Sequence, residues 1–364
     1  MIELNRLVRE NIRRLAPYSS ARHEFAGSAE IFLDANENAF GSPIEPKRNR
    51  YPDPLQTAVK ESVAKIKGVS PSQIFIGNGS DEAIDLLFRI FCEPGRDSCI
   101  ICPPTYGMYQ VAADINDVKA VEVQLTAEYQ LDVAAIKSAF TERTKLLFIC
   151  SPNNPTGNAM RRSDILDLAS SFDGIVVVDE AYIDFSSEPS LISDLADYPN
   201  LVVLQTFSKA WGMAGARVGL ALASEEIIDL LNRVKPPYNV SQLSQTAVIK
   251  ALSRRDQVAA WIRETLSQRR SLQGSLEEFD FVDRIYPSDA NFLLVKVNDA
   301  NAVYRHLVRS KIVVRNRTNV ALCEGCLRIT IGTAEENVRL IRALELFRPS
   351  TNADGRSTSN LAVS

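Results

Sequence analysis

Histidine is scarce in this sequence: the 364 residues include only His23 and His306. A zinc site built mainly from imidazole ligands is therefore excluded, and a Ser-His-Asp triad would have to use one of these two residues. His23 lies near the N-terminus, and His306 lies in an expected helix. We expect both side chains to be partly exposed and to take no part in chemistry.

Long apolar runs and a strong charge imbalance are also missing. No run approaches the roughly 18 apolar residues of a membrane span. The 41 Lys and Arg residues against 45 Asp and Glu give a net charge of -4, without the basic excess of a nucleic-acid-binding protein. The first 15 residues alternate charged and apolar residues at helical spacing, unlike a signal peptide. We expect a soluble, cytoplasmic protein that binds neither nucleic acid nor membranes.

The six cysteines do not form a convincing metal site. Cys99 and Cys102 lie three apart in an expected strand, so their side chains point to opposite faces. Cys323 and Cys326 flank a glycine that could bend the chain, but no further ligands accompany them. We expect reduced, buried thiols and no bound metal.

The apolar residues form an α/β pattern. Four short continuous apolar runs indicate strands that are buried on both faces, as in a parallel sheet. Helical patterns alternate with these strands, and after about residue 245 the pattern changes to a smaller α+β unit. The expected strands are Ser98–Cys102, Lys145–Cys150, Ile175–Val178 and Leu201–Gln205, followed in the smaller unit by Asn291–Val297, Lys311–Val314 and Leu327–Ile331. The expected helices are Leu55–Lys67, Asp81–Phe91, Arg254–Phe279, Ala302–Ser310 and Thr333–Phe347.

The length favours about two domains. We expect an N-terminal helix and arm over residues 1–30, a large domain over 31–245, a small domain over 246–348 and a disordered tail over 349–364. A long loop, rich in Pro, Gly and Arg, is expected over residues 41–54.

Polar side chains follow three successive expected strands. Asn154 follows the first, Asp179 and Tyr182 the second, and Lys209 the third. Ligands of open α/β sheets bind outside the carboxyl ends of the strands. Each feature alone has an ordinary explanation as a turn, a helix cap or a solvated lysine. Together they predict an amide, a carboxylate and an amine at one edge of the sheet.

Two further segments predict an anion site. The turn IGNGSDE precedes an expected helix, where free backbone N–H groups at Ser80 and Asp81 would bind a phosphate, although ordinary helix capping is an alternative. Thr206, Ser208 and Arg217 lie close to Lys209 in the sequence and add hydroxyls and a guanidinium. An amine, a buried acid, a phenol, an amide and a phosphate site are what pyridoxal 5'-phosphate needs.

Several segments resemble the histidinol-phosphate aminotransferase family, which consists of fold-type I enzymes that depend on pyridoxal phosphate. The resemblance runs from about residue 10 to 348. SPNNPTG, DEAY and SKAWGMAGARVG are typical of aminotransferases in general, and RYPDP and CPPTYGMY make the resemblance more specific. It implies a large domain with a mostly parallel sheet and a smaller α+β C-terminal domain.

The resemblance also implies a role for each site residue. Lys209 would be the Schiff-base lysine and proton shuttle, and Asp179 would pair with the pyridine nitrogen. The remaining cofactor ligands would be Asn154 and Tyr182 on the ring oxygen, Tyr106 stacked on the ring, and Ser80, Asp81, Thr206, Ser208 and Arg217 around the phosphate. Tyr51 would reach that phosphate from the neighbouring subunit, which implies a homodimer.

Three residues are candidates for binding the substrate anion. Arg328 is implied by the resemblance, and Arg315 and Tyr18 are further candidates, although a surface salt bridge would equally explain Arg315. A guanidinium fork can bind either the carboxylate of glutamate or the phosphate of histidinol phosphate.

The implied activity is a ping-pong amino transfer in histidine biosynthesis. It converts histidinol phosphate and 2-oxoglutarate to imidazole acetol phosphate and glutamate. Two alternatives share the fold: an aromatic amino-acid aminotransferase and a threonine-phosphate decarboxylase. A cofactor-binding regulator without turnover is a third alternative, but the acidic chain does not favour the DNA binding it would need.

Overall fold

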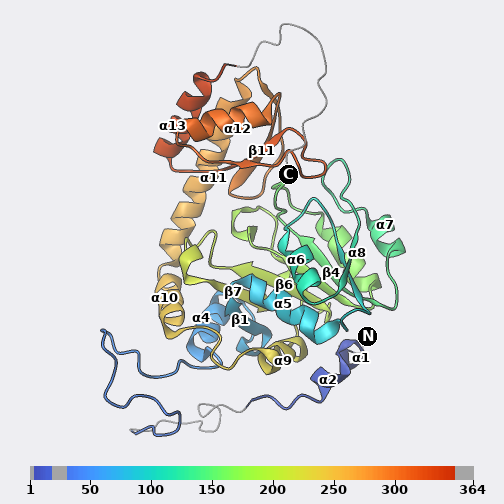
Figure 1. The fold of residues 1–364 in the computed structure, drawn as a ribbon, viewed down its shortest axis with the longest axis vertical. Coiled ribbons are helices and arrows are strands. Elements are labelled where there is room, and N and C mark those ends of the chain that lie inside the picture. The colour runs from blue at the N-terminus through green and yellow to red at the C-terminus, as the bar shows by residue number, and fades with distance from the viewer. Residues whose placement is uncertain (1–3, 19–30, 349–364) are drawn as a thin grey trace, which may run out of the picture.

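A computed structural model describes residues 4–18 and 31–348, and Figure 1 shows its two parts. Two short helices, α1 (Leu4–Leu7) and α2 (Glu10–Arg13), come first in the chain. His23 and the expected tail over 349–364 lie outside the described residues.

The larger part is built around a sheet with the strand order β1-β7-β6-β5-β4-β2-β3. Adjacent strands from β3 to β6 are parallel, whereas β7 is antiparallel to both its neighbours. The strands are β1 (Ile74–Asn78), β2 (Ser98–Ile101), β3 (Lys119–Glu122), β4 (Thr144–Cys150), β5 (Ile175–Asp179), β6 (Leu201–Thr206) and β7 (Val218–Leu222). The expected mostly parallel α/β sheet is confirmed.

The central strands alternate between two apolar cores, one on each face of the sheet. In β5, Ile175 and Val177 enter one core, and Val176 and Val178 enter the other. This explains why the strands are continuous apolar runs. Helices cover both faces: α5 (Ser80–Phe91), α6 (Met108–Ile115) and α9 (Glu225–Val234) on one, and α4 (Thr57–Lys67), α7 (Val133–Ser138), α8 (Arg162–Ser171) and α10 (Gln242–Leu252) on the other.

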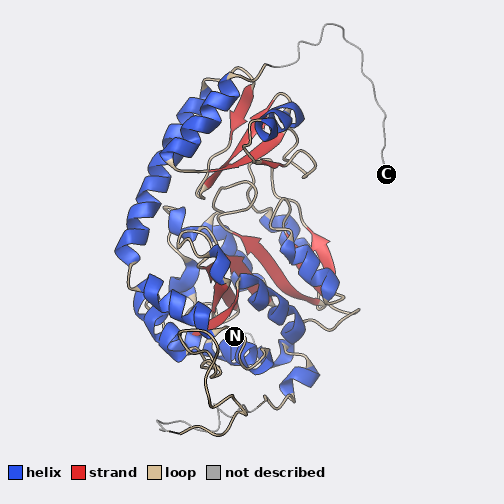
Figure 2. Ribbon diagram, turned by 60° about the vertical axis from the view of Figure 1, so that its left-hand side comes forward, coloured by secondary structure: helices blue, strands red, loops and turns tan. Residues whose placement is uncertain are grey.

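The smaller part has an antiparallel sheet with the order β10-β11-β9-β8 and its own core. Its strands are β8 (Val282–Ile285), β9 (Phe292–Val297), β10 (Arg315–Asn316) and β11 (Cys326–Thr330), and its helices are α11 (Arg255–Glu277), α12 (Ala300–Arg309) and α13 (Ala334–Glu345). Figures 1 and 2 show α11 as the long helix that joins the two parts. The predicted domain boundary at residues 245/246 falls inside α10 and stays a prediction.

The strand predicted over Lys311–Val314 is wrong. Lys311 has a positive φ of 63° in the turn that follows α12, and pairing with β11 begins only at Arg315. The prediction rested on the β-branched residues of this run, which favour strands. In the structure the chain first turns after α12, so it joins the sheet only at Arg315.

The histidine and cysteine side chains have structural surroundings. The His306 ring nitrogen Nε2 lies 2.7 Å from the carbonyl oxygen of Ala343, and its ring packs edge-on against Phe347. Cys99 and Cys102 enter opposite cores of the large sheet. Within residues 4–18 and 31–348, no three His, Cys, Asp or Glu side chains are grouped to hold a metal ion, and no helix is long and apolar enough to cross a membrane.

Candidate active site

A pocket of about 630 Å³ lies between the carboxyl ends of the parallel strands and the small domain. Because β4, β5 and β6 are neighbours, the loops that follow them meet at one edge of the sheet. Twelve of the fourteen predicted site residues line this pocket: Ser80, Asp81, Tyr106, Asn154, Asp179, Tyr182, Thr206, Ser208, Lys209, Arg217, Arg315 and Arg328. The two exceptions are Tyr18 and Tyr51.

Asp179 is a buried carboxylate on the pocket floor, only 3% exposed. It accepts hydrogen bonds from the Tyr109 hydroxyl at 2.9 Å and the Ala181 N–H at 3.0 Å. Burial raises its pKa to about 6, against the effect of these two hydrogen bonds. Among the described residues it forms no ion pair, so this buried negative charge is available to a cationic group from outside the chain.

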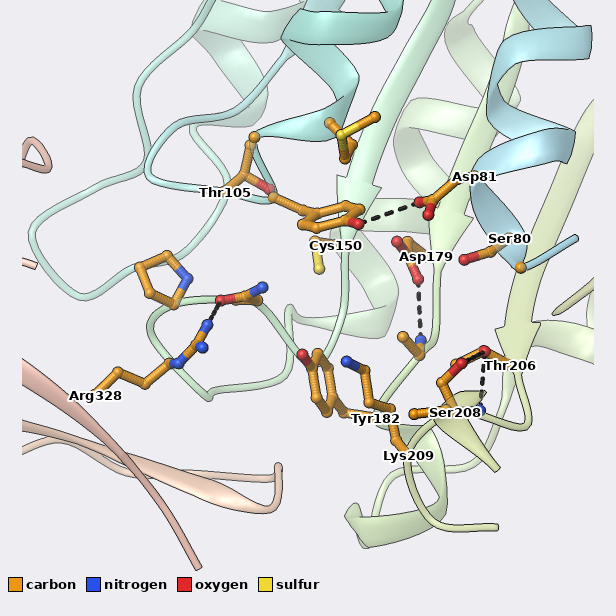
Figure 3. Close-up of a pocket in the computed structure, with 18 of the residues that line it drawn as sticks. Ser80, Asp81, Thr105, Cys150, Asp179, Tyr182, Thr206, Ser208, Lys209 and Arg328 are labelled. Carbon is orange, nitrogen blue, oxygen red and sulfur yellow. Dashed lines mark hydrogen bonds between the residues drawn. The ribbon is translucent and has the colours of Figure 1, made fainter. Parts of the chain in front are cut away.

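The Lys209 amine lies beside Asp179 and above the Tyr182 ring, with Nζ at 5.4 Å from the ring centroid. Figure 3 shows this amine in the middle of the pocket. Partial burial lowers the pKa of Lys209, and the charges of Arg328 and Arg217 lower it further, whereas Asp179 opposes the shift. A lowered pKa increases the fraction of neutral amine, which is the form that acts as a nucleophile or a base.

The start of α5 and the β6–β7 connection together form what we term the anion cradle: Gly79–Asp81, Thr206, Ser208 and Arg217. The first N–H groups of a helix have no partner within the helix, and no side chain caps α5 at Gly79. Ser208 donates its N–H to the Thr206 hydroxyl at 3.1 Å, and Arg217 Nη1 lies 3.4 Å from the Ser208 hydroxyl. Hydroxyls, a guanidinium and free N–H groups converge on a space suited to a phosphate.

Two glycines make the anion cradle possible. Gly79 has a φ of 75°, and a Cβ there would lie 2.7 Å from Arg217 Nη2. A Cβ on Gly219 would lie 2.1 Å from the Ser80 nitrogen. Strand β7 can therefore approach the start of α5 only because position 219 has no side chain.

Tyr106 closes the pocket from the side of α6. Its hydroxyl donates to Asp81 Oδ1 at 3.1 Å, and its ring meets that of Tyr109 edge-on at 5.6 Å. Asp81 also lies 3.5 Å from Arg217 Nη2. These contacts fix the ring of Tyr106 at the mouth of the space between the anion cradle and Asp179.

The small domain contributes three guanidiniums, which we term the arginine cluster: Arg315, Arg317 and Arg328. Arg328 donates a hydrogen bond to the side-chain oxygen of Asn154 and lies 5.2 Å from the Phe292 ring centroid. Figure 3 shows Arg328 entering on the side of the pocket opposite Thr206 and Ser208. The pocket therefore has separate positions for two anionic groups.

Tyr18 and Tyr51 do not reach this pocket within their own chain. Tyr18 is 74% exposed, and Tyr51 stacks on Tyr238 at 4.5 Å in a separate groove of about 600 Å³. The loop that carries Tyr51 projects from the large domain in Figure 1. A role for either residue in a neighbouring subunit stays a proposal.

The sequence reasoning missed Tyr109 and Arg317. Tyr109 lies in CPPTYGMY but is separated from Asp179 by 70 residues, so only the tertiary structure shows their hydrogen bond. Arg317 lies two residues after Arg315, and strand alternation could have placed both on one face.

Comparison with known proteins agrees with this geometry. The family profile "Aminotransferase class I and II" matches residues 32–344. A histidinol-phosphate aminotransferase of Parabacteroides distasonis is 52% identical over 345 residues, which cover 95% of this chain and 99% of the relative. The enzyme of the same name from Cytophaga hutchinsonii is 51% identical over 344 residues, covering 94% and 99%.

Solved structures show the same fold. The Sinorhizobium meliloti histidinol-phosphate aminotransferase in complex with pyridoxal-5'-phosphate has a TM-score of 0.76 at 24% identity, covering 85% of this chain and 88% of that one. The L-threonine-O-3-phosphate decarboxylase of Porphyromonas gingivalis has a TM-score of 0.70 at 25% identity, covering 82% and 90%. The chain therefore belongs to the class I and II aminotransferases and, within them, to the histidinol-phosphate aminotransferase family.

Proposed function

We propose that this chain is a pyridoxal-phosphate-dependent aminotransferase that exchanges an amino group between histidinol phosphate and 2-oxoglutarate. The observation that carries the proposal is the convergence of the Lys209 amine, the buried Asp179 carboxylate, the anion cradle and the arginine cluster on one pocket. The identity of about 50% to relatives of this name, over nearly the whole of both chains, supports the same substrates.

The pocket fits the cofactor at both of its ends. The anion cradle offers N–H groups, hydroxyls and Arg217 to the phosphate, and Asp179 offers a negative charge to the protonated ring nitrogen. Asn154 and Tyr182 supply an amide and a phenol for the ring oxygen, and Tyr106 supplies a ring to stack on. When bound, the cofactor supplies an aldehyde that condenses with amines and a ring that withdraws electrons from the substrate Cα.

The side chains then divide the work of the reaction. Lys209 would hold the cofactor through its amine, and in its neutral form this amine would accept the proton from the substrate Cα and donate it back. Asp179 would pair with the protonated ring nitrogen of the cofactor. Arg328 would bind and orient the substrate anion. The same residues act in both half-reactions, which gives a ping-pong order.

We also propose a homodimer in the cytoplasm. Large apolar side chains on the loop that carries Tyr51 are exposed, including Phe40 at 99% and Leu33 at 85%, as expected for a surface that a second copy covers. All six cysteines are buried free thiols, which fits a reducing compartment. Tyr51 would complete the partner's anion cradle.

The two half-reactions of the purified protein test the substrate assignment. We expect histidinol phosphate and glutamate each to convert the cofactor absorbance band in a single turnover, with a higher kcat/KM for histidinol phosphate than for phenylalanine or tyrosine. A preference for the aromatic amino acids would assign the chain to the alternative transaminase. Release of carbon dioxide from threonine phosphate would assign it to the decarboxylase, whose fold it also shares.

A further inference from the structure

The loop that carries Tyr51 joins the rest of the large domain beside the segment that follows α9. Tyr51 stacks on Tyr238 of that segment, with ring centroids 4.5 Å apart and ring planes 16° from parallel. Three residues further along the loop, Pro54 is buried, and its carbonyl oxygen contacts Lys235 of the same segment. The two segments are therefore joined by an aromatic contact and a polar contact.

Lys235 makes the polar contact with its side-chain amine. Its Nζ donates to the carbonyl oxygens of Pro54 at 2.7 Å, Pro236 at 3.3 Å and Pro237 at 3.0 Å. A protonated lysine has three N–H donors, so each of them has one acceptor. We term these four residues the lysine clamp. The clamp joins two positions that are 181 residues apart in the chain.

The ammonium of the lysine clamp is buried without a carboxylate partner. Lys235 is only 6% exposed, and among the described residues it forms no ion pair. Burial lowers its pKa to about 8, while the charges of Glu82 and Asp53 oppose the shift, so the amine is still mainly protonated at pH 7. A buried charge without an ion-pair partner is costly. This cost indicates that the clamp fixes the position of the loop and does not simply fill the core.

Further hydrogen bonds connect the lysine clamp to the elements that build the anion cradle. The Gln56 side chain donates to the Pro54 carbonyl at 2.8 Å and to the Asn239 side-chain oxygen at 3.1 Å. Asn239 in turn donates to the Ile76 carbonyl in β1 at 2.9 Å and to the Glu82 carboxylate in the first turn of α5 at 3.1 Å. The base of the loop is therefore held at a defined position relative to β1 and α5.

We propose that Lys235 is a positioning residue for Tyr51. The lysine clamp holds the base of the loop so that the Tyr51 hydroxyl reaches the cofactor phosphate in the partner's anion cradle. Lys235 does not line the pocket itself, so it acts through Tyr51. This inference rests on the proposed function for the cofactor and for the homodimer.

The cofactor with and without its phosphate tests this role. Pyridoxal lacks the phosphate, so the Tyr51 hydroxyl has nothing to bind there. Lys235→Met removes the ammonium and keeps a side chain of similar length. In absorbance titrations of cofactor-free protein, we expect Lys235→Met to raise the apparent Kd of pyridoxal 5'-phosphate by about 5- to 10-fold and that of pyridoxal by less than about twofold. Tyr51→Phe should raise the first Kd by about tenfold or more, as expected for a lost hydrogen bond to a charged group.

Two further variants control for a general effect on the fold. Lys60→Met removes a neighbouring buried lysine of α4 that is outside the lysine clamp, and it should leave both Kd values within about twofold of wild type. Lys235→Arg keeps the charge and several donors in a planar fork, which cannot meet three carbonyls as an ammonium does. It should change the Kd of pyridoxal 5'-phosphate in the same direction as Lys235→Met by a smaller factor, and it tests the role even if Lys235→Met does not fold.

A double variant shows whether Lys235 and Tyr51 act together. If Lys235 acts through Tyr51, the double variant Tyr51→Phe/Lys235→Met should bind pyridoxal 5'-phosphate no more weakly than Tyr51→Phe alone. Additive losses, equal losses for both ligands, or unchanged binding in Lys235→Met and Lys235→Arg would overturn the role of Lys235. Unchanged binding in Tyr51→Phe would remove the role of Tyr51 and with it this inference. Failure of the wild type to bind pyridoxal 5'-phosphate would instead remove the proposed function.

Discussion

The floor and the roof of the pocket satisfy their polar groups in different ways. On the floor, in the large domain, Asp179 has two hydrogen bonds from the chain, and the Thr206 and Ser208 hydroxyls bond to each other. On the roof, in the small domain, the Nε atoms of Arg317 and Arg328 are buried without hydrogen-bond partners. The polar groups of the floor are held in place by the chain, as expected for the site of a ligand that stays bound. The guanidiniums of the roof are positive groups suited to an anion that binds and leaves in each catalytic cycle.

Removing the Lys209 amine should have the largest effect on activity. Lys209→Ala is expected to lower the turnover rate by more than about a thousandfold, because a lost general base alone costs ~10²–10⁴-fold. The fold should persist, since Lys209 is not part of the apolar core. With cofactor added, the variant should show no absorbance band that borohydride bleaches. A normal bleachable band would refute the assignment of Lys209.

Asp179→Asn should lower activity by about a hundredfold and yet stabilise the cofactor-free protein. The folded-state pKa of Asp179 is raised from 3.8 to about 6, so the cofactor-free protein loses stability as the pH rises from about 4 to about 6. Asn removes this cost. At pH 8 the variant should gain about 1–3 kcal/mol in free energy of unfolding, and near pH 4 it should gain almost nothing.

Denaturant unfolding of cofactor-free protein at the two pH values measures this effect. Wild type and variant would be compared with the cofactor removed, because a bound cation would itself lower the pKa of the carboxyl. If Asp179→Asn is less stable than wild type at pH 8, the ionised Asp179 carboxylate is stabilised by its hydrogen bonds within the protein, and the prediction is wrong.

Mixing two defective variants tests whether Tyr51 of one subunit contributes to the active site of the other subunit. Each site would use the Lys209 of its own subunit and the Tyr51 of the other. In a dimer of one Tyr51→Ala subunit and one Lys209→Ala subunit, one site therefore carries both defects and the other site is intact. Random exchange of subunits should then recover about a quarter of the wild-type activity. A mixture of Lys209→Ala and Lys209→Arg should recover none. If the first mixture also recovers nothing, Tyr51 acts within its own subunit, and full activity of Tyr51→Ala by itself would show that Tyr51 has no role.

The smallest effect is expected for Tyr109→Phe. The change removes the 2.9 Å hydrogen bond to Asp179 but keeps the ring, which stacks on Phe148 at 4.9 Å. A lost hydrogen bond of this kind costs ~1 kcal/mol, or about a fivefold loss in kcat/KM, of similar size for both substrates. A loss confined to histidinol phosphate would mean that Tyr109 reads the substrate and does not support the floor.

Much of the floor could be predicted from the sequence because it is encoded locally. Continuous apolar strands and the polar residues directly after them fix the edge of the sheet and the side chains that meet there. Asn154 and Lys209 follow β4 and β6, and Asp179 is the last residue of β5. The pairing of these strands brings the three residues together as expected. The helices Leu55–Lys67 and Arg254–Phe279 were likewise placed correctly, as α4 and α11.

What could not be predicted depends on contacts between distant segments. Strands β1 and β7 contain glycines needed for close packing, which weakens the strand signal, and the reversed direction of β7 has no local signature. The partners of Tyr109 and Arg317 depend on which helix or strand faces the pocket. The position of Tyr51 relative to a second subunit cannot be derived from one chain.

The anion cradle combines residues 79–81 with residues 206–217, which meet only because Gly219 of β7 packs against the start of α5. During synthesis, a nascent chain that ends before Leu222 therefore cannot hold the cofactor phosphate in this way. A ligand that binds only the assembled sheet stabilises it by mass action. Cofactor supply is thus expected to govern how much newly made protein survives proteolysis, before any substrate is present.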